Sequence, residues 1–291
     1  MNTKQIKFTK KDFAKMFPDN DSCLEWLKNH LYPDGIYCPI CKQITPHAKL
    51  RQRPVYACDI CRHQISPLAY TIFHKSTTPL KTWFEAIFEM STTRTGYSAK
   101  ALQRSTGVTY KTAWRMFKQI RSMLGENTGK MFGMVEADET YIGGKEKNKH
   151  ASKRIQSGRG TIGKLAVMGA VERNGRVTTA RLQGTTIPEM HKFIYANISP
   201  TATLYSDEHS GYDGLNGYNH ISVKHHAGEY VKGTAHTNTI EGFWSLVKRG
   251  ISGVYHHVSP DYLQTYVNEY SFRYNHRKDE RPMFHSFLNQ I

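Results

Sequence analysis

Alternating apolar and polar side chains predict a β-strand at residues 134–142, near the middle of the chain. Its apolar face carries Val135, Ala137 and Tyr141, and its polar face carries Glu136, Asp138 and Thr140. The pair Gly143-Gly144 ends the pattern. Apolar runs at 165–171 and 177–182 surround Asn174-Gly175, a dipeptide that favours a tight β-hairpin.

The rest of the C-terminal half mixes short strands with longer helices. We expect strands at 202–206 and 221–224, helices at 188–196, 239–249 and 260–274, and a short helix after Pro282. Strands and helices mixed in this way are typical of an α/β fold, and we assign residues 129–291 to one catalytic domain.

The N-terminal part has the periodicity of helices. Two short helices are expected within residues 9–31, and three more at 80–90, 98–105 and 110–124. Gly107 separates the last two and Thr109 can cap the final one, which is the pattern of a helix-turn-helix. That helix carries four basic residues that either contact DNA or form a solvated face: Lys111, Arg115, Lys118 and Arg121. We assign residues 1–35 to an N-terminal helical segment and 67–128 to a helical DNA-binding segment.

Residues 36–66 are expected to form a separate zinc ribbon. They contain two Cys-x-x-Cys pairs, Cys38 with Cys41 and Cys58 with Cys61, which are separated by sixteen residues. This spacing is typical of a structural Zn²⁺ site with four thiolate ligands. Because the segment has too few apolar residues for a core of its own, the metal would supply its stability.

The charge balance favours a polyanionic partner. The chain has 40 Lys and Arg against 24 Asp and Glu, a formal net charge of +16, which makes nucleic acid the expected partner. The lysine-rich start lacks the apolar run of a secretory signal, and no apolar run is long enough to span a membrane. We therefore expect a cytoplasmic protein with reduced cysteines and no membrane contact.

Three acidic residues far apart in the sequence form the candidate catalytic site. Asp138 lies on the polar face of its strand, Asp207 directly follows strand 202–206, and Glu241 lies at the start of helix 239–249. Such positions can converge in an α/β domain. Carboxylates without His or Cys suit Mg²⁺ (or Mn²⁺), and a pair of such ions can act on a phosphodiester.

The two aspartates have competing interpretations. Glu136 lies on the same face as Asp138, two residues earlier. Glu139 projects to the opposite face and is expected to be a supporting or a surface group. Asp207 could instead cap a turn.

The third acid and the rest of its helix also have two interpretations. Glu241 could form a capping box with Asn238 as the N-cap, a role compatible in part with metal binding. Lys248 and Arg249 either hold a phosphate near the metals or form a solvated basic helix end, which the helix dipole favours in any case.

Three blocks together resemble the catalytic motifs of bacterial insertion-sequence transposases, in the ISXO-like group whose members begin with a zinc ribbon. The first is Val-Glu-Ala-Asp-Glu-Thr-Tyr-Ile-Gly-Gly at 135–144, and the second is Tyr-Ser-Asp-Glu-His-Ser-Gly-Tyr at 205–212. The third, at 236–250, is His-Thr-Asn-Thr-Ile-Glu-Gly-Phe-Trp-Ser-Leu-Val-Lys-Arg-Gly. The resemblance runs from about residue 10 to the end of the chain.

This resemblance implies a ribonuclease-H-like catalytic domain with an Asp-Asp-Glu metal site. By position the triad would be Asp138, Asp207 and Glu241, with Lys248 near the scissile phosphate. The third position is asparagine in some relatives, so Asn238 stays a candidate beside Glu241. The implied activity is a Mg²⁺-dependent DNA transposase that cuts element ends and joins the 3′-hydroxyl to target DNA. Its partner would be double-stranded DNA, bound by at least a homodimer.

Two other functions remain open at this point. One is a sequence-specific DNA-binding regulator with an inactive catalytic fold. The other is a ribonuclease-H-like nuclease that cuts DNA without strand transfer, because the same metal site serves both reactions.

Overall fold

The computed structural model describes residues 6–126, 129–144, 149–154, 160–223 and 236–291. The chain divides into two compact units. The N-terminal unit comprises Met1–Met123 with Lys278–Ile291, and the C-terminal unit comprises Leu124–Arg277. Within the described ranges no helix combines the length and the apolar composition needed to cross a membrane.

The N-terminal unit is built from helices around an aromatic core. Its helices are α1 (Lys10–Met16), α2 (Asn20–Leu31), α3 (Leu80–Thr92), α4 (Ala99–Thr106), α5 (Tyr110–Ser122) and α9 (Met283–Leu288). The ring of Phe284 lies 5.6 Å from Phe13, 5.9 Å from Phe17 and 5.7 Å from Phe88, measured between ring centroids. From the sequence we assigned residues 278–291 to the catalytic domain. In the structure these ring contacts pack α9 against the N-terminal helices, so this segment belongs to the N-terminal unit.

The turn between α4 and α5 has the expected chemistry. α4 ends at Gly107, which has the left-handed φ of 74° that glycine adopts without a steric penalty. The Thr109 side chain then caps α5 by accepting the backbone N–H of Thr112. Both residues were predicted in these roles from the sequence alone.

Five short strands form the cysteine-containing segment. β1 (Tyr37–Cys38) pairs with β2 (Gln43–Ile44), while β4 (Tyr56–Cys58) lies between β3 (His47–Lys49) and β5 (Gln64–Ile65). The segment is held to α2 by polar contacts, because Tyr56 donates its hydroxyl to Glu25 at 2.8 Å and Lys49 forms an ion pair with Asp21.

The C-terminal unit contains a mixed five-stranded sheet with the order β10-β9-β6-β7-β8. Its strands are β6 (Met134–Ile142), β7 (Leu165–Glu172), β8 (Val177–Arg181), β9 (Thr203–Ser206) and β10 (Asn219–Ser222). β6, β7 and β8 are antiparallel, whereas β9 and β10 run parallel to β6. The last predicted strand, 221–224, starts two residues earlier in the structure, and Lys224 lies outside the described residues.

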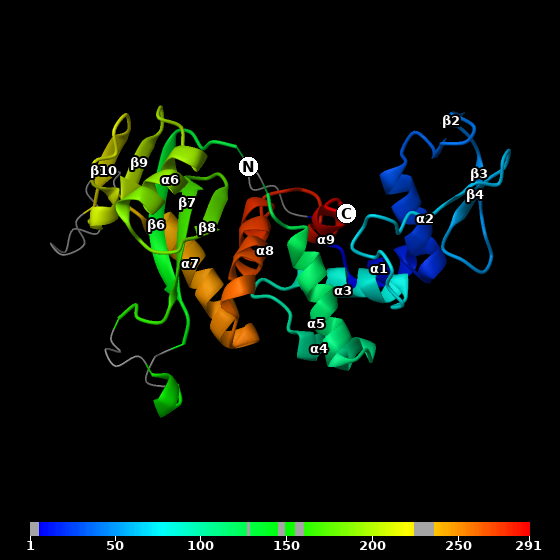
Figure 1. Ribbon diagram of the computed structural model, residues 1–291, viewed down its shortest axis with the longest axis horizontal. Coiled ribbons are helices and arrows are strands. Elements are labelled where there is room, and N and C mark those ends of the chain that lie inside the picture. The colour runs from blue at the N-terminus through cyan, green and yellow to red at the C-terminus, as the bar shows by residue number, and fades with distance from the viewer. Residues whose placement is uncertain (1–5, 127–128, 145–148, 155–159, 224–235) are drawn as a thin grey trace. The chain divides into compact units, whose positions relative to one another are not determined.

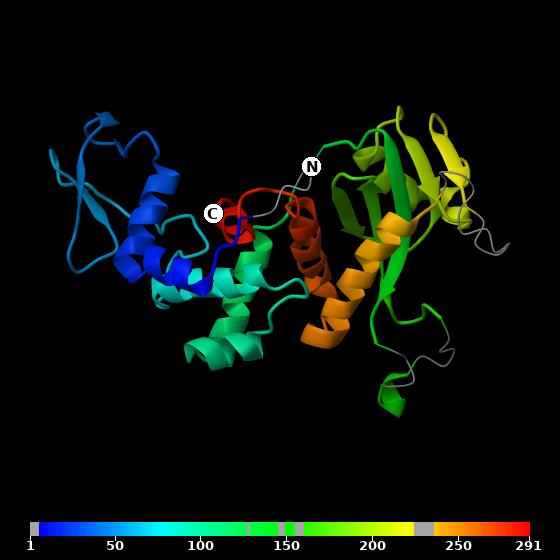
Figure 2. The same ribbon diagram turned by 180° about the vertical axis from the view of Figure 1, so that it is seen from behind.

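Helices cover both faces of this sheet (Figures 1 and 2). α6 (Ile187–Asn197) packs on one face, where Val135 and Ala137 of β6 meet Phe193 and Ile194. α7 (Asn238–Gly250) and α8 (Leu263–Asn275) pack on the other, where Trp244 and Tyr270 join the core around β7. The alternation of β6 thus sends its odd-numbered side chains towards α6 and its even-numbered side chains towards α7.

The register between β6 and β9 explains why two remote aspartates meet. The last pair of this parallel ladder is Glu136 with Tyr205. Asp138 and Asp207 each lie two residues further along their strand direction, so they are level with one another beyond the end of the ladder.

Glu136 anchors the N-terminus of α7 to the sheet. Its carboxylate is fully buried and accepts the backbone N–H groups of Thr239 at 2.8 Å and Ile240 at 3.1 Å, which are otherwise unpaired at a helix start. Arg173 donates to the same carboxylate at 2.8 Å, donates to the His236 carbonyl at 2.8 Å, and lies over the Tyr205 ring. One buried ion pair therefore connects β6, the β7–β8 turn, β9 and α7.

We expect Glu136→Gln to destabilise the protein by about 3–5 kcal/mol, because it leaves the Arg173 guanidinium without a counter-charge in a buried setting. Chemical denaturation measures the change in the free energy of unfolding.

The matched control is Glu172→Gln. Glu172 lies in the adjacent strand and pairs with Arg176 at 3.5 Å in a partly exposed position, so its loss should cost less than about 1 kcal/mol. Equal destabilisation by the two variants would contradict the anchoring role of Glu136.

Candidate metal centres and DNA-facing residues

The sheet edge gathers three carboxylates. Asp138, Glu139 and Asp207 each offer an oxygen atom, and these atoms all lie within 4.8 Å of one another. Asp138 approaches from the α7 side of β6 and Glu139 from the α6 side, with Asp207 at the edge between them. The sequence analysis expected Asp138 and Asp207 to converge and treated Glu139 as a supporting or surface group.

Glu139 is held in this cluster by two partners from the segment after β9. Tyr212 donates its hydroxyl to Glu139 at 3.2 Å, and His209 Nε2 lies 3.7 Å from the other carboxylate oxygen. The Glu139 side chain is only 6 % exposed, so it is not a surface group. Asp207 in turn accepts the backbone N–H of His209 at 3.1 Å, so it also has the turn role suggested by the sequence.

Burial and repulsion from neighbouring carboxylates make Asp138 and Glu139 costly to ionise. Burial raises the pKa of Asp138 to about 8, with further repulsion from Glu139, Asp207 and Glu241. Burial and Asp207 also raise the pKa of Glu139. A divalent cation relieves this kind of repulsion, and a set of hard carboxylate oxygens fits Mg²⁺ or Mn²⁺.

Glu241 lies in the first turn of α7 and acts on Asp138 through its charge, but it is not among the three acids with oxygens within 4.8 Å. Its carboxylate accepts the Thr237 hydroxyl at 2.8 Å. The capping box proposed for Asn238 and Glu241 is wrong. α7 begins at Asn238, and its N-cap is Thr237. Glu136 on β6, instead of Asn238, satisfies the first backbone donors.

The basic residues predicted to face DNA differ in their exposure. On α7, Lys248 and Arg249 are exposed in the last turn. On α5, Lys111 and Lys118 are exposed, and Arg115 is half-buried and donates to Ser76 at 3.2 Å.

Arg121 does not lie on the exposed face of α5. It is 3 % exposed and lies over the ring of Phe117, one turn earlier on the buried side of the helix. The prediction that Arg121 contacts DNA is therefore wrong for this structure.

The four expected cysteines form a second cluster. Cys38, Cys41, Cys58 and Cys61 have all sulfur atoms within 4.8 Å of one another, with Cys38 3.4 Å from Cys61 and Cys41 3.9 Å from Cys58. These separations suit a tetrahedral ion with Zn–S bonds of about 2.3 Å. The backbone N–H of Cys61 and the Thr45 hydroxyl lower the pKa of Cys58 to about 6, which favours the thiolate needed for metal binding.

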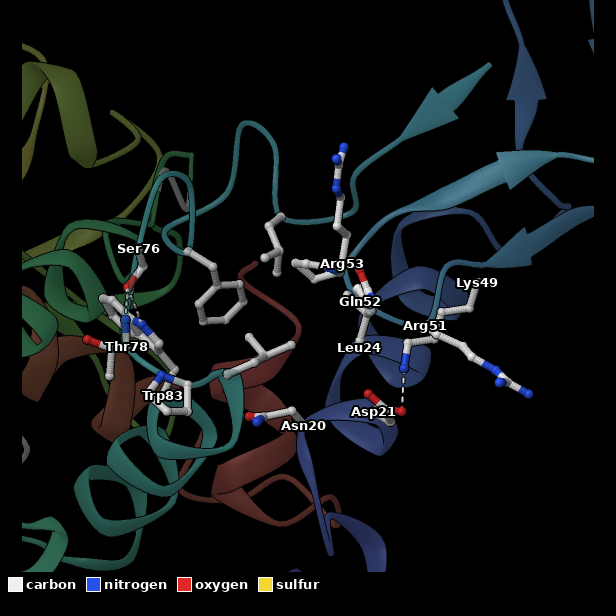
Figure 3. A pocket seen from close by; sticks show the side chains of 15 residues that line it. Asn20, Asp21, Leu24, Lys49, Arg51, Gln52, Arg53, Ser76, Thr78 and Trp83 are labelled. Atoms are coloured by element: carbon white, nitrogen blue, oxygen red, sulfur yellow. Dashed lines mark hydrogen bonds and ion pairs between the residues drawn. The ribbon is translucent and has the colours of Figure 1, made fainter. Parts of the chain in front are cut away.

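A hollow of about 270 Å³ lies within the N-terminal unit, between α2, ribbon residues 49–54 and the start of α3 (Figure 3). Leu24 and Trp83 contribute to its walls, and the ion pair between Lys49 and Asp21 lies at its edge. Arg51 and Arg53 on the ribbon loop also line it and are exposed. This hollow and the carboxylate cluster belong to different units.

Residues 130–275 match the ISXO2-like transposase domain, and residues 18–64 match the transposase zinc-ribbon domain. The chain belongs to the ISXO2-like transposase family. An uncharacterized protein in transposable element ISH50 of Halobacterium salinarum is 28 % identical over 254 residues, which is 82 % of this chain and 85 % of that relative.

A solved structure also shows a distant match. It is titled as the simian T-cell lymphotropic virus intasome in complex with PP2A regulatory subunit B56 gamma. The identity is 11 % and the TM-score is 0.30 over 65 % of this chain, which spans 65 % of that chain. This similarity is too remote to support a conclusion.

The sequence contained little information about the roles of Glu136 and Glu139. Both lie within two residues of Asp138 in the same strand, so residue type alone did not distinguish the three acids. Only the contacts with Arg173 and α7 on one side, and with Tyr212 on the other, assign Glu136 to anchoring and Glu139 to the cluster.

We expect Cys38→Ser to release the bound zinc, because three thiolates hold the ion far less tightly than four and the ribbon has little core to replace it. Metal analysis together with limited proteolysis of residues 36–66 measures both effects. Cys23→Ser is the control, since Cys23 is buried outside the cluster. Full zinc content in Cys38→Ser would contradict the assignment.

The raised pKa of Asp138 predicts a pH-dependent stability. Below about pH 4 the carboxyl group is protonated in both the folded and the unfolded protein, and it costs nothing. Between the ordinary value of 3.8 and the folded value of about 8, its ionisation increasingly destabilises the fold. Asp138→Asn should therefore melt roughly 5 °C or more above the wild type at pH 8 without added Mg²⁺.

The two melting temperatures should approach each other as the pH falls towards 4, and added Mg²⁺ should raise only that of the wild type. A difference that does not change with pH would refute this account of the site.

Proposed function

We propose that this transposase cuts DNA at the ends of its element and joins the new 3′-hydroxyl to target DNA, using two metal ions held by its acidic cluster. The single observation that carries the proposal is the convergence of Asp138 and Asp207 with Glu139 at one sheet edge, with Glu241 near enough to repel Asp138. When bound, Mg²⁺ or Mn²⁺ would activate a water or hydroxyl nucleophile and neutralise charge on the scissile phosphate.

The sheet topology supports a ribonuclease-H-like fold for residues 129–277. Three antiparallel strands followed by two strands parallel to the first, in the order β8-β7-β6-β9-β10, agree with the fold that the sequence resemblance implied. In this arrangement the central strand and its parallel neighbour each supply one aspartate.

The protein's own side chains would have separate roles in the reaction. Asp138 and Asp207 are the proposed metal ligands, and either Glu139 or Glu241 completes the set. Asn238, exposed at the start of α7, stays the alternative from the sequence. Lys248 on the same helix is proposed to contact the DNA backbone near the scissile phosphate.

The N-terminal unit is proposed to recognise the element ends. α4, Gly107 and α5 would act as a helix-turn-helix in which exposed Lys111 and Lys118 contact phosphates. The zinc ribbon, residues 36–66, would present exposed Arg51 and Arg53 to the same duplex. Because two element ends must be brought together, we propose that at least a dimer assembles on DNA.

We expect Asp138→Asn and Asp207→Asn each to reduce cleavage by on the order of a thousandfold or more, because a lost metal site removes several kcal/mol of transition-state stabilisation. Labelled duplexes taken from the DNA at the two ends of the element, incubated with Mg²⁺, report cutting and joining separately. Asp213→Asn is the control, since Asp213 is an exposed acid in the segment after β9. Normal cleavage by the Asp138 variant would remove the basis of the proposal.

The same assay identifies the third ligand. Glu139→Gln, Glu241→Gln and Asn238→Ala are compared, and the variant with the deepest loss of cleavage and unchanged folding marks the ligand. Cutting without joining by the wild-type protein would favour a nuclease, and duplex binding without cutting would favour a regulator.

A further inference from the structure

We propose that a basic hollow at the far end of β6 and α7 binds the phosphate backbone of DNA beside the scissile bond. The hollow has a volume of about 590 Å³ and is formed entirely by the C-terminal unit. Its charged and imidazole side chains are Lys164, Lys248, His256 and His257. Among the described residues that line it, none is acidic.

The position of the hollow fits a segment of the substrate strand, and in this respect the inference rests on the proposed function. Ile142, which lines the hollow, is four residues beyond Asp138 on β6, a distance of about 13 Å along a strand. Lys248 is seven residues beyond Glu241 on α7, about 10 Å along a helix. These lengths correspond to roughly three to four base-pair steps of a duplex.

The backbone at one rim of the hollow is strained. After α7 the chain continues as a π-helical turn at Ile251–Tyr255, a rare geometry that occurs frequently at functional sites. His256 then has φ 59° and ψ −44°, and the N–H of His257 donates to the Tyr255 carbonyl at 2.6 Å. This is a γ-turn with a positive central φ, which is rare and strained for a residue other than glycine.

Neighbouring contacts hold the strained turn in place. His256 donates its Nδ1–H to the Ser252 carbonyl at 2.9 Å, which fixes the imidazole over the turn. Tyr255 donates its hydroxyl to the buried Glu269 carboxylate on α8 at 3.1 Å. The structure therefore keeps a histidine in a backbone conformation that favours glycine, and that histidine lines the same hollow as Lys164 and Lys248.

Another part of the lining places Lys164 close to the glycine pair at the end of β6. A Cβ atom added at Gly143 would lie 3.2 Å from the Lys164 Cα atom and 3.3 Å from its Cγ atom, so a side chain there would have to displace Lys164 by a few tenths of an ångström. Gly143 and Gly144 are both exposed and line the hollow together with Lys164. Basic side chains from the residue preceding β7, from α7 and from the turn after α7 therefore line the hollow, and none of its described lining residues is acidic.

The experiment measures binding of the full-length, zinc-loaded protein to a 30-base-pair duplex of arbitrary sequence, without Mg²⁺, across a range of salt concentrations. Lys164→Gln should weaken binding and lower the slope of log affinity against log salt by about 0.9, the contribution of one phosphate contact. The control Lys192→Gln removes the same charge from exposed α6 on the other sheet face, and its slope should equal that of the wild type.

A second variant tests the strained turn. His256→Gly removes the backbone strain together with the hydrogen bond to Ser252, so the melting temperature should change little. At pH 6, where a histidine can carry its second ring proton and donate its Nε2–H to a phosphate, the variant should weaken duplex binding roughly three- to tenfold. Equal slopes for Lys164→Gln and Lys192→Gln, or wild-type binding by His256→Gly, would overturn the proposal. Because no cleavage is measured, these outcomes are independent of the Asp138→Asn test of the reaction itself.

Discussion

The buried carboxylate of Glu136 fixes the geometry on which the candidate active site depends. It replaces the missing acceptors at the start of α7 and is neutralised by Arg173, which also contacts Tyr205 on β9. The elements that carry Asp138, Asp207 and Glu241 are therefore connected through one ion pair. A buried charge is costly unless it is paired and hydrogen-bonded, and Glu136 has both an ionic partner and backbone donors in this arrangement of strand and helix.

Neighbouring acids on β6 perform opposite tasks because their surroundings differ. Glu136 faces a guanidinium and backbone donors, whereas burial and other carboxylates raise the pKa of Asp138 to about 8. The first arrangement stabilises the fold, and the second stores repulsion that a bound cation can relieve. A site that holds buried carboxylates close together for metal binding is expected to reduce the stability of the fold when no metal is bound.

Much of the local structure could be predicted from the sequence. The alternation of β6, the Asn174-Gly175 hairpin, the Gly107 and Thr109 signals between α4 and α5, and the cysteine spacing each act over a few residues. The sequence did not predict that Arg121 is buried or that α9 belongs to the N-terminal unit. Both features depend on contacts with aromatic rings: Arg121 lies over Phe117, and Phe284 of α9 packs against Phe13, Phe17 and Phe88.

By itself the sequence determined the main helices, most strands of the C-terminal sheet, the four clustered cysteines and the two aspartates, since periodicity, turn chemistry and residue type are local properties. Only the tertiary structure decided how the remaining acids are used. The pairing of Glu136 with Tyr205 makes Asp138 and Asp207 level, and Tyr212 holds Glu139 in the cluster. Glu136 takes the capping role that the sequence suggested for Asn238. These outcomes depend on register and packing between segments far apart in the chain, which no local pattern encodes.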